Sequence, residues 1–275
     1  MRVVRTSLVL LLSIFSALFV FLPTVSASRP LSLDGNNQET YGAALSQAIM
    51  ITTSHKNDLI ILAASELANR PLGSSQISSV SDSAGLSWAN RFRAGVVLVN
   101  GNGVYEELWF AISPSILESD SITLEFTPTS GGTESTANPK NFTNGGDLQV
   151  FGVSGVDTAN PFDPNPALPV AAIHSCLPIP PGCTSEPSVT MSPSKRNELV
   201  YGIMALWPSS TPNATADEGF SLIQSSPSSA IEYSVVKGQI SSELTIGFTL
   251  SSSSEVNQWL MIGDAVQGSA HGVSR

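Results

Sequence analysis

Charged side chains are scarce in this sequence. Asp, Glu, Lys and Arg make up 12% of the 275 residues, about half of the roughly 25% found in typical globular domains. Basic residues are the rarest, with 12 Lys and Arg against 22 Asp and Glu and a net charge of −10. Because nucleic-acid binding takes a clustered Lys/Arg surface, we expect no nucleic-acid partner. Ser, Thr, Asn and Gly must cover the surface instead, as in many extracellular proteins.

Long apolar runs are missing except near the N-terminus. Arg2 and Arg5 precede an uninterrupted apolar run over 8–22, and a small-x-small cleavage site ends at Ala27. This order predicts a secretory signal peptide over residues 1–27. A membrane anchor is the alternative, but the run of about 15 residues is shorter than the roughly 20 that a spanning helix needs. We therefore expect a secreted or cell-surface protein without an integral membrane anchor in the mature chain.

Cysteine is also rare, and both copies follow the predicted signal peptide. In an oxidising compartment Cys176 and Cys183, seven positions apart, most simply form one disulfide. A metal site would need more ligands, and only His174 is near.

Helical periodicity is almost absent, whereas short apolar or alternating runs bounded by Gly, Pro, Asn or Ser are frequent. Ile122, Leu124 and Phe126, for example, alternate with Thr123 and Glu125, as in a half-buried antiparallel strand. With 41% hydrophobic residues, the chain can build a core. We expect an all-β fold, an antiparallel β-sandwich of jelly-roll or Ig-like type.

The order of these elements repeats along the chain. The matched pairs are KNDLIILA at Lys56 with RNELVYGI at Arg196, GLSW at Gly85 with GFSL at Gly219, ELWFAI at Glu107 with EYSVVK at Glu232, SITLEFT at Ser121 with ELTIGFT at Glu243, and FGVSGV at Phe151 with IGDAVQ at Ile262. The repeat predicts two related strand sets. The expected segments are a signal peptide (1–27), an N-terminal extended segment (28–42), a first β half (43–157), a Pro-rich crossover with the disulfide loop (158–186), a second β half (187–267) and a tail (268–275).

Two layouts of these halves are open. Each half could form its own small sandwich, or the two could interleave as one. The second half has only about 80 residues, which makes a marginal core by itself and favours one joined β-sandwich.

Several of these motifs resemble a known module. NDLIILA, SDSAGLSWANR, ELWFAI, SITLEF and especially GVSGVDTANPFD are similar to a two-half β-sandwich module of secreted and surface proteins of bacteria and archaea. The likeness covers nearly all of 49–267. It implies a sandwich scaffold outside the cell, and it implies no particular reaction.

Polar residues in the crossover could have two roles. Asp157, Asp163 and Asn165 could supply oxygen ligands to calcium, although their spacing matches no EF-hand. Alternatively, these side chains hydrogen-bond their own backbone in Asx turns. We therefore expect no cofactor, with calcium as the weaker alternative.

Catalytic constellations are not evident. His55, His174 and His271 lie near no G-x-S-x-G elbow. Glu107 and Glu232 occupy matching repeat positions, which indicates a structural role near strand ends. We therefore expect no enzyme, with an extracellular hydrolase as the weaker alternative.

Surface recognition is the remaining possibility. Trp88 and Trp207 lie near strand ends and could contact a glycan, which makes a carbohydrate-binding module the alternative function. Asn141 and Asn213 begin N-x-Thr glycosylation sequons. Our first expectation is an exported structural or adhesion protein whose partners are other surface proteins, itself or glycans. The segment Ser28–Tyr41 could join copies by adding a strand to a neighbour's sheet edge.

Overall fold

The computed structural model contains sixteen β-strands and no helix in its described residues. These residues lie in one compact unit, 29–270. They are 29–42, 44–68, 77–97, 103–126, 145–175, 186–207, 213–226, 228–239, 243–251 and 258–269. Strand neighbours in the sheets run antiparallel, so the predicted all-β antiparallel class is confirmed. In the described ranges no helix is long and apolar enough to cross a membrane.

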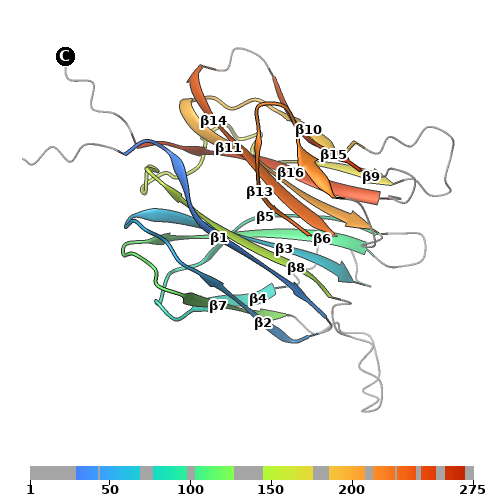
Figure 1. The fold of residues 1–275 in the computed structure, drawn as a ribbon, viewed down its shortest axis with the longest axis horizontal. Coiled ribbons are helices and arrows are strands. Elements are labelled where there is room, and N and C mark those ends of the chain that lie inside the picture. Colours follow the sequence, from blue (N-terminus) through green and yellow to red (C-terminus); the bar gives the residue numbers. More distant parts are fainter. Residues whose placement is uncertain are drawn as a thin grey trace, which may run out of the picture. The chain divides into compact units, whose positions relative to one another are not determined.

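The first eight strands, called the first half here, form two sheets (Figure 1). The first large sheet has the order β1-β8-β3-β6-β5, and the first small sheet has the order β2-β7-β4. The strands are β1 (Ser32–Tyr41), β2 (Ser46–Ile51), β3 (Asp58–Ala68), β4 (Ile77–Asp82), β5 (Ala89–Val97), β6 (Gly103–Ser113), β7 (Asp120–Phe126) and β8 (Gly146–Ser154). β1 pairs with β8, β2 with β7 and β3 with β6, a nested wrapping like that of jelly rolls.

The other eight strands, the second half, also form two sheets. The second large sheet has the order β13-β14-β11-β16-β9, and the second small sheet has the order β10-β15-β12. The strands are β9 (Val170–Ser175), β10 (Ser188–Met191), β11 (Arg196–Trp207), β12 (Ala214–Ala216), β13 (Ser221–Ser225), β14 (Ser229–Gln239), β15 (Leu244–Leu250) and β16 (Gln258–Gln267). Read from β9, the large-sheet order is that of the first half with eight added to each number.

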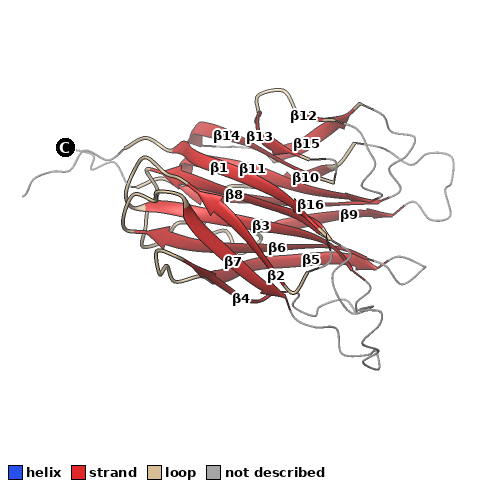
Figure 2. Cartoon of the chain, turned by 60° about the horizontal axis from the view of Figure 1, so that its bottom comes forward, coloured by secondary structure: helices blue, strands red, loops and turns tan. Residues whose placement is uncertain are grey.

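The four sheets stack as layers, with the two large sheets in the middle (Figure 2). The central strand β3 explains the stacking, because its side chains alternate between two apolar clusters. Leu59 and Ile61 face the cluster shared with the second large sheet, whereas Ile60 and Leu62 face the first small sheet. β11 does the same in the second half, with Leu199 on the shared cluster. Both central strands are therefore buried on two faces, which is why they read as continuous apolar runs.

This layering differs from the single joined sandwich that the sequence favoured. Each half builds its own large and small sheet, and the shared cluster then joins the halves. β9 lies inside the segment 158–186 that we expected to be only a crossover. Its short apolar run Val170–Ile173 completes the edge of the second large sheet, so β1 has a counterpart in the second half.

Candidate functional site

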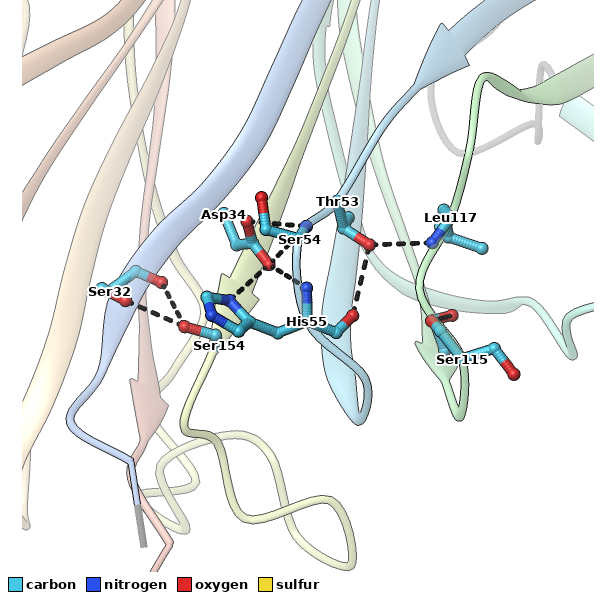
Figure 3. Close-up of polar contacts among 9 residues, drawn as sticks. Ser32, Asp34, Thr53, Ser54, His55, Ser115, Leu117 and Ser154 are labelled. Carbon is cyan, nitrogen blue, oxygen red and sulfur yellow. Dashed lines mark hydrogen bonds and ion pairs between the residues drawn. The ribbon is translucent and has the colours of Figure 1, made fainter.

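A carboxylate on β1 holds the turn before the central strand β3 (Figure 3). The backbone N–H groups of Ser54 and His55 donate to Asp34 at 3.0 and 2.9 Å, and Nδ1 of His55 lies 2.9 Å from the same carboxylate. The side chain of Asp34 is 7% exposed and that of His55 38%. Burial acts to raise the pKa of Asp34, but hydrogen bonds from Asp58, Ser54 and His55 hold this pKa below its ordinary value.

Asp58, the first residue of β3, is a fully buried carboxyl. Burial first, and then the hydrogen bond and charge of Asp34, raise the pKa of Asp58 to about 7, against a smaller opposing effect of Arg29. Neither carboxyl oxygen of the fully buried Asp58 has an N–H or hydroxyl partner among the described residues.

The second half contains a similar arrangement before β11. Asp163 accepts hydrogen bonds from the N–H and, at 2.7 Å, the hydroxyl of Ser194 in the preceding turn. Burial first, and then the hydrogen bond and charge of Asp163, raise the pKa of Glu198 to about 9. Glu198 and Asp58 are matched positions in the repeat, and the residues before them, Asn197 and Asn57, both have positive φ, 60° and 63°. The matched Asn-Asp and Asn-Glu pairs were the sequence signal for these sites.

The three crossover residues considered for calcium bond to the protein itself. Asp157 accepts the N–H of Ala159 at 3.0 Å, and Asn165 accepts that of Ala167 at 3.0 Å, as in Asx turns. Asp163 accepts the N–H of Asn165 at 2.6 Å in addition to its bonds with Ser194. In the described part of the chain, no group of three or more His, Cys, Asp or Glu side chains is placed to hold a metal ion.

His55 and Asp34 have the geometry of a base and its orienting acid, but no nucleophile completes it. Within the described ranges, His55 hydrogen-bonds through its N–H and Nδ1 to Asp34 and through its carbonyl to Thr53. The nearby hydroxyls of Ser32 and Ser154 bond to each other at 2.8 Å instead. A hydrolase would need a hydroxyl joined to the other ring nitrogen. In the described part of the chain, this arrangement secures the turn before β3.

The matched residues Glu107 and Glu232 join the large sheets to the small ones. Glu232 accepts the N–H of Asp217 and of Gly247, each at 3.0 Å, and so ties β14 to the second small sheet. Glu107 accepts the N–H of Ile77, at 3.4 Å, at the start of β4. Burial first, and then the charge of Asp217, raise the pKa of Glu232 to about 8, against the two hydrogen bonds. Both contacts are structural, but Glu107 and Glu232 lie within β6 and β14 and not at strand ends as we expected.

A buried ion pair crosses between the halves. Arg91 on β5 donates from Nε and Nη2 to the fully buried Asp264 on β16, at 2.9 and 3.1 Å. The Tyr201 hydroxyl donates to the same carboxylate at 3.2 Å. The guanidinium also lies 4.1 Å from the centre of the Phe162 ring. Sequence reasoning missed this site, because its partners lie far apart in the chain.

A second polar junction between the halves surrounds Asp147 on β8. Its carboxylate accepts hydroxyl hydrogen bonds from Thr40 and Ser226, each at 2.6 Å, and also from Ser228 and Ser229. A cavity of about 10 Å³ lies beside it, lined by Ser65, Glu66, Val104, Gly146, Ala205, Leu206 and Ser228. That volume is at most enough for one water molecule.

The residues predicted to contact glycans or to carry glycosylation lie in different environments. The indole N–H of Trp88 donates to Asp82 at 2.6 Å, and its half-buried ring packs on the core of the first half. Asn213 is exposed at the start of β12. Residues 1–27, predicted as a signal peptide, lie outside the described residues, as do Cys176, Cys183, Asn141 and the side chain of Trp207.

The comparisons with known proteins found no relatives. No protein-family model matches the chain, and neither a similar curated protein nor a similar solved structure was found. The resemblance to a surface-protein module therefore stays a prediction.

Proposed function

We propose that this chain is an exported, non-enzymatic structural or adhesion protein that assembles by exchanging β1 between copies. One observation carries the proposal: β1 lies at the edge of the first large sheet and, among the described strands, pairs only with β8. A strand with one neighbour can leave without breaking the ladders behind it. The place that it vacates fits the same strand from a second copy, as in domain swapping.

The composition of β1 supports this exchange. Within the strand only Asp34 and Tyr41 are buried, and the other positions are exposed or half-buried. Leu33 packs against the shared apolar cluster, and further contacts of β1 are polar, such as the hydrogen bond from the Asn37 amide to the carbonyl of Met50 at 2.9 Å. Residues 42–45 join it to β2, and short connections of this kind favour swapping.

Matching features of the halves support the prediction that the two strand sets are related. The strand orders agree, β1 corresponds to β9, and an Asn with positive φ stands immediately before each of the matched residues Asp58 and Glu198. We infer that the chain is an internal duplication whose halves pack like the subunits of a twofold dimer. β9 has strands before and after it in the chain, whereas β1 is the first of the described strands. This difference favours β1 as the exchanged strand.

Export rests on the sequence. If residues 1–27 are removed as a signal peptide, β1 starts four residues from the new N-terminus, so little chain has to move with it. An oxidising location also suits the proposed Cys176–Cys183 disulfide and glycosylation at Asn213.

Light scattering after size exclusion tests the proposal on the native secreted protein over a range of concentrations, with calcium or with a chelator. We expect multimers, and we expect a variant lacking Ser28–Tyr41 to stay monomeric and to bind a synthetic peptide of that segment. A scrambled peptide is the control. A native protein that is monomeric at every concentration in both conditions would contradict the proposal and would make a glycan screen at Trp88 and Trp207 the next step.

A further inference from the structure

We propose that the two large sheets recognise each other as unlike partners, so that a first half binds a second half and rejects a copy of itself. Asp264 and Arg91 are the specificity-determining pair of this interface, and Asp147 acts in the same direction. The partner that each face accepts is the opposite half, from the same chain or from another copy. Such pairing goes beyond the exchange of β1 and does not depend on it.

The two faces that meet are built from matching positions. β8 in the first large sheet and β16 in the second lie beside the central strands β3 and β11 in the same order. Since Leu59 and Leu199 match, their ladder partners Val153 and Val266 match as well. Because successive side chains of a strand alternate between its faces, the positions that face the other half are Asp147, Gln149, Phe151 and Val153 on β8, and Leu260, Ile262, Asp264 and Val266 on β16.

Each face carries one buried carboxylate, and the two carboxylates stand at positions that do not match. Asp264 occupies the position of Phe151, whereas Asp147 occupies the position of Leu260, and all four side chains are buried. The match in sequence had placed Phe151 with Ile262 instead, two residues away. A face that is acidic where its counterpart is apolar is not self-complementary, as the equal faces of a twofold dimer must be.

Both carboxylates find partners on the opposite half. Asp264 accepts two hydrogen bonds from Arg91 of β5, at 2.9 and 3.1 Å. Asp147 accepts hydroxyl hydrogen bonds from three serines of the second half, which are Ser226, Ser228 and Ser229. Because a buried carboxylate without a partner is unfavourable, each acid stabilises the complex only with the half that it meets here.

A pair of like halves would leave a charge uncompensated. If two second halves packed in the same way, β13 would take the place of β5, and its sequence SLIQS contains no basic residue. The Tyr201 hydroxyl, which donates to Asp264 within the second half, supplies a hydrogen bond but no charge. Two first halves would bring Arg91 against Phe151 instead of Asp264. The unlike pair is therefore favoured by a penalty on each like pair.

Exchange of halves between cut chains tests this pairing. The full chain is folded first and is then cut by a specific protease at a site inserted after Ala159, in the exposed segment 158–160. Cut proteins with and without isotope labels are mixed in urea, the urea is removed, and native mass spectrometry counts the pairs. We expect complexes of one first half with one second half, and no complexes of like halves.

Two neutral variants test the role of the ion pair in this choice. A first half with Arg91→Met is offered equal amounts of the wild-type second half and of its Asp264→Asn form. We expect it to bind the Asp264→Asn form about a hundredfold more tightly, because the wild-type second half would bury an uncompensated charge. The wild-type first half should show the opposite preference, by about tenfold, since the Arg91 side chain is 20% exposed. Arg93→Met, at an exposed position of the same strand, is the matched control and should behave as the wild type.

Three outcomes would overturn the unlike pairing. One is a wild-type protein in which like pairs are as abundant as unlike pairs. Another is a first half that binds the two forms of the second half equally; the wild-type first half makes this choice even if Arg91→Met folds poorly. The third is a cut wild-type chain whose halves separate at once, because the two faces would then not bind each other. Exchange of β1 is measured on the uncut protein, so either proposal can fail alone.

Discussion

At the scale of single residues, the ion pair between Arg91 and Asp264 is the contact whose loss should lower the free energy of unfolding most. In Arg91→Met the fully buried Asp264 keeps, among the described residues, only the Tyr201 hydroxyl and the backbone N–H of Ala265 as hydrogen-bond donors. Removing one partner of a buried ion pair leaves the other charge uncompensated and lowers stability by about 3–5 kcal/mol. We expect the free energy of unfolding in urea to fall by about that amount. Adding Asp264→Asn removes the buried charge and keeps the hydrogen bond to Tyr201. This second substitution should restore a large part of the lost free energy of unfolding. A double variant as unstable as Arg91→Met would contradict this interpretation.

Residue roles could be predicted only where partners are close in sequence. The Asx alternative for Asp157 and Asn165 matches their hydrogen bonds, because an Asx turn involves residues two positions apart. Arg91 and Asp264 are 173 positions apart, and Asp34 lies on a different strand from Asp58. One sequence contains no signal for such pairs until the sheet order is known.

At the scale of elements, Glu232 makes the attachment of the second small sheet sensitive to pH. Its pKa is about 8 in the fold and ordinarily 4.5, so its contribution to stability is full below about pH 4.5 and is lost as pH rises to about 8. Glu106 has a pKa of about 8, raised first by burial, and acts in the same direction. We expect the melting temperature to fall between pH 5 and pH 9, and the fall to be smaller in Glu232→Gln. If the melting temperature falls equally with pH in the native protein and in Glu232→Gln, this role of Glu232 is contradicted.

Strand periodicity identified the central strands β3 and β11 and the alternating strand β7. It failed at β9, which is short and lies in a Pro-rich stretch between Pro169 and Cys176. The prolines indicated an extended crossover, and pairing with β16 decides instead that Val170–Ser175 is a strand.

At the scale of the whole molecule, the repeat in sequence could not predict how the halves meet. Strand composition is the same whether two sets interleave or stack. The difference lies in the central strands, whose two apolar faces require a layer on each side. Stacking leaves β1 at an edge, and the proposal of assembly follows from that position.

Cysteine cross-linking of β1 to β8 tests this central claim most directly. Gln38 and Gln149 are direct partners across these strands, so Gln38→Cys with Gln149→Cys should form a disulfide wherever β1 docks. Ser221→Cys with Tyr233→Cys is the matched control, because it lies within the β13–β14 pair. On a non-reducing gel, with the wild-type protein as baseline, we expect disulfide-linked multimers only for the first pair. Bonds formed solely within single chains at every concentration would contradict the account.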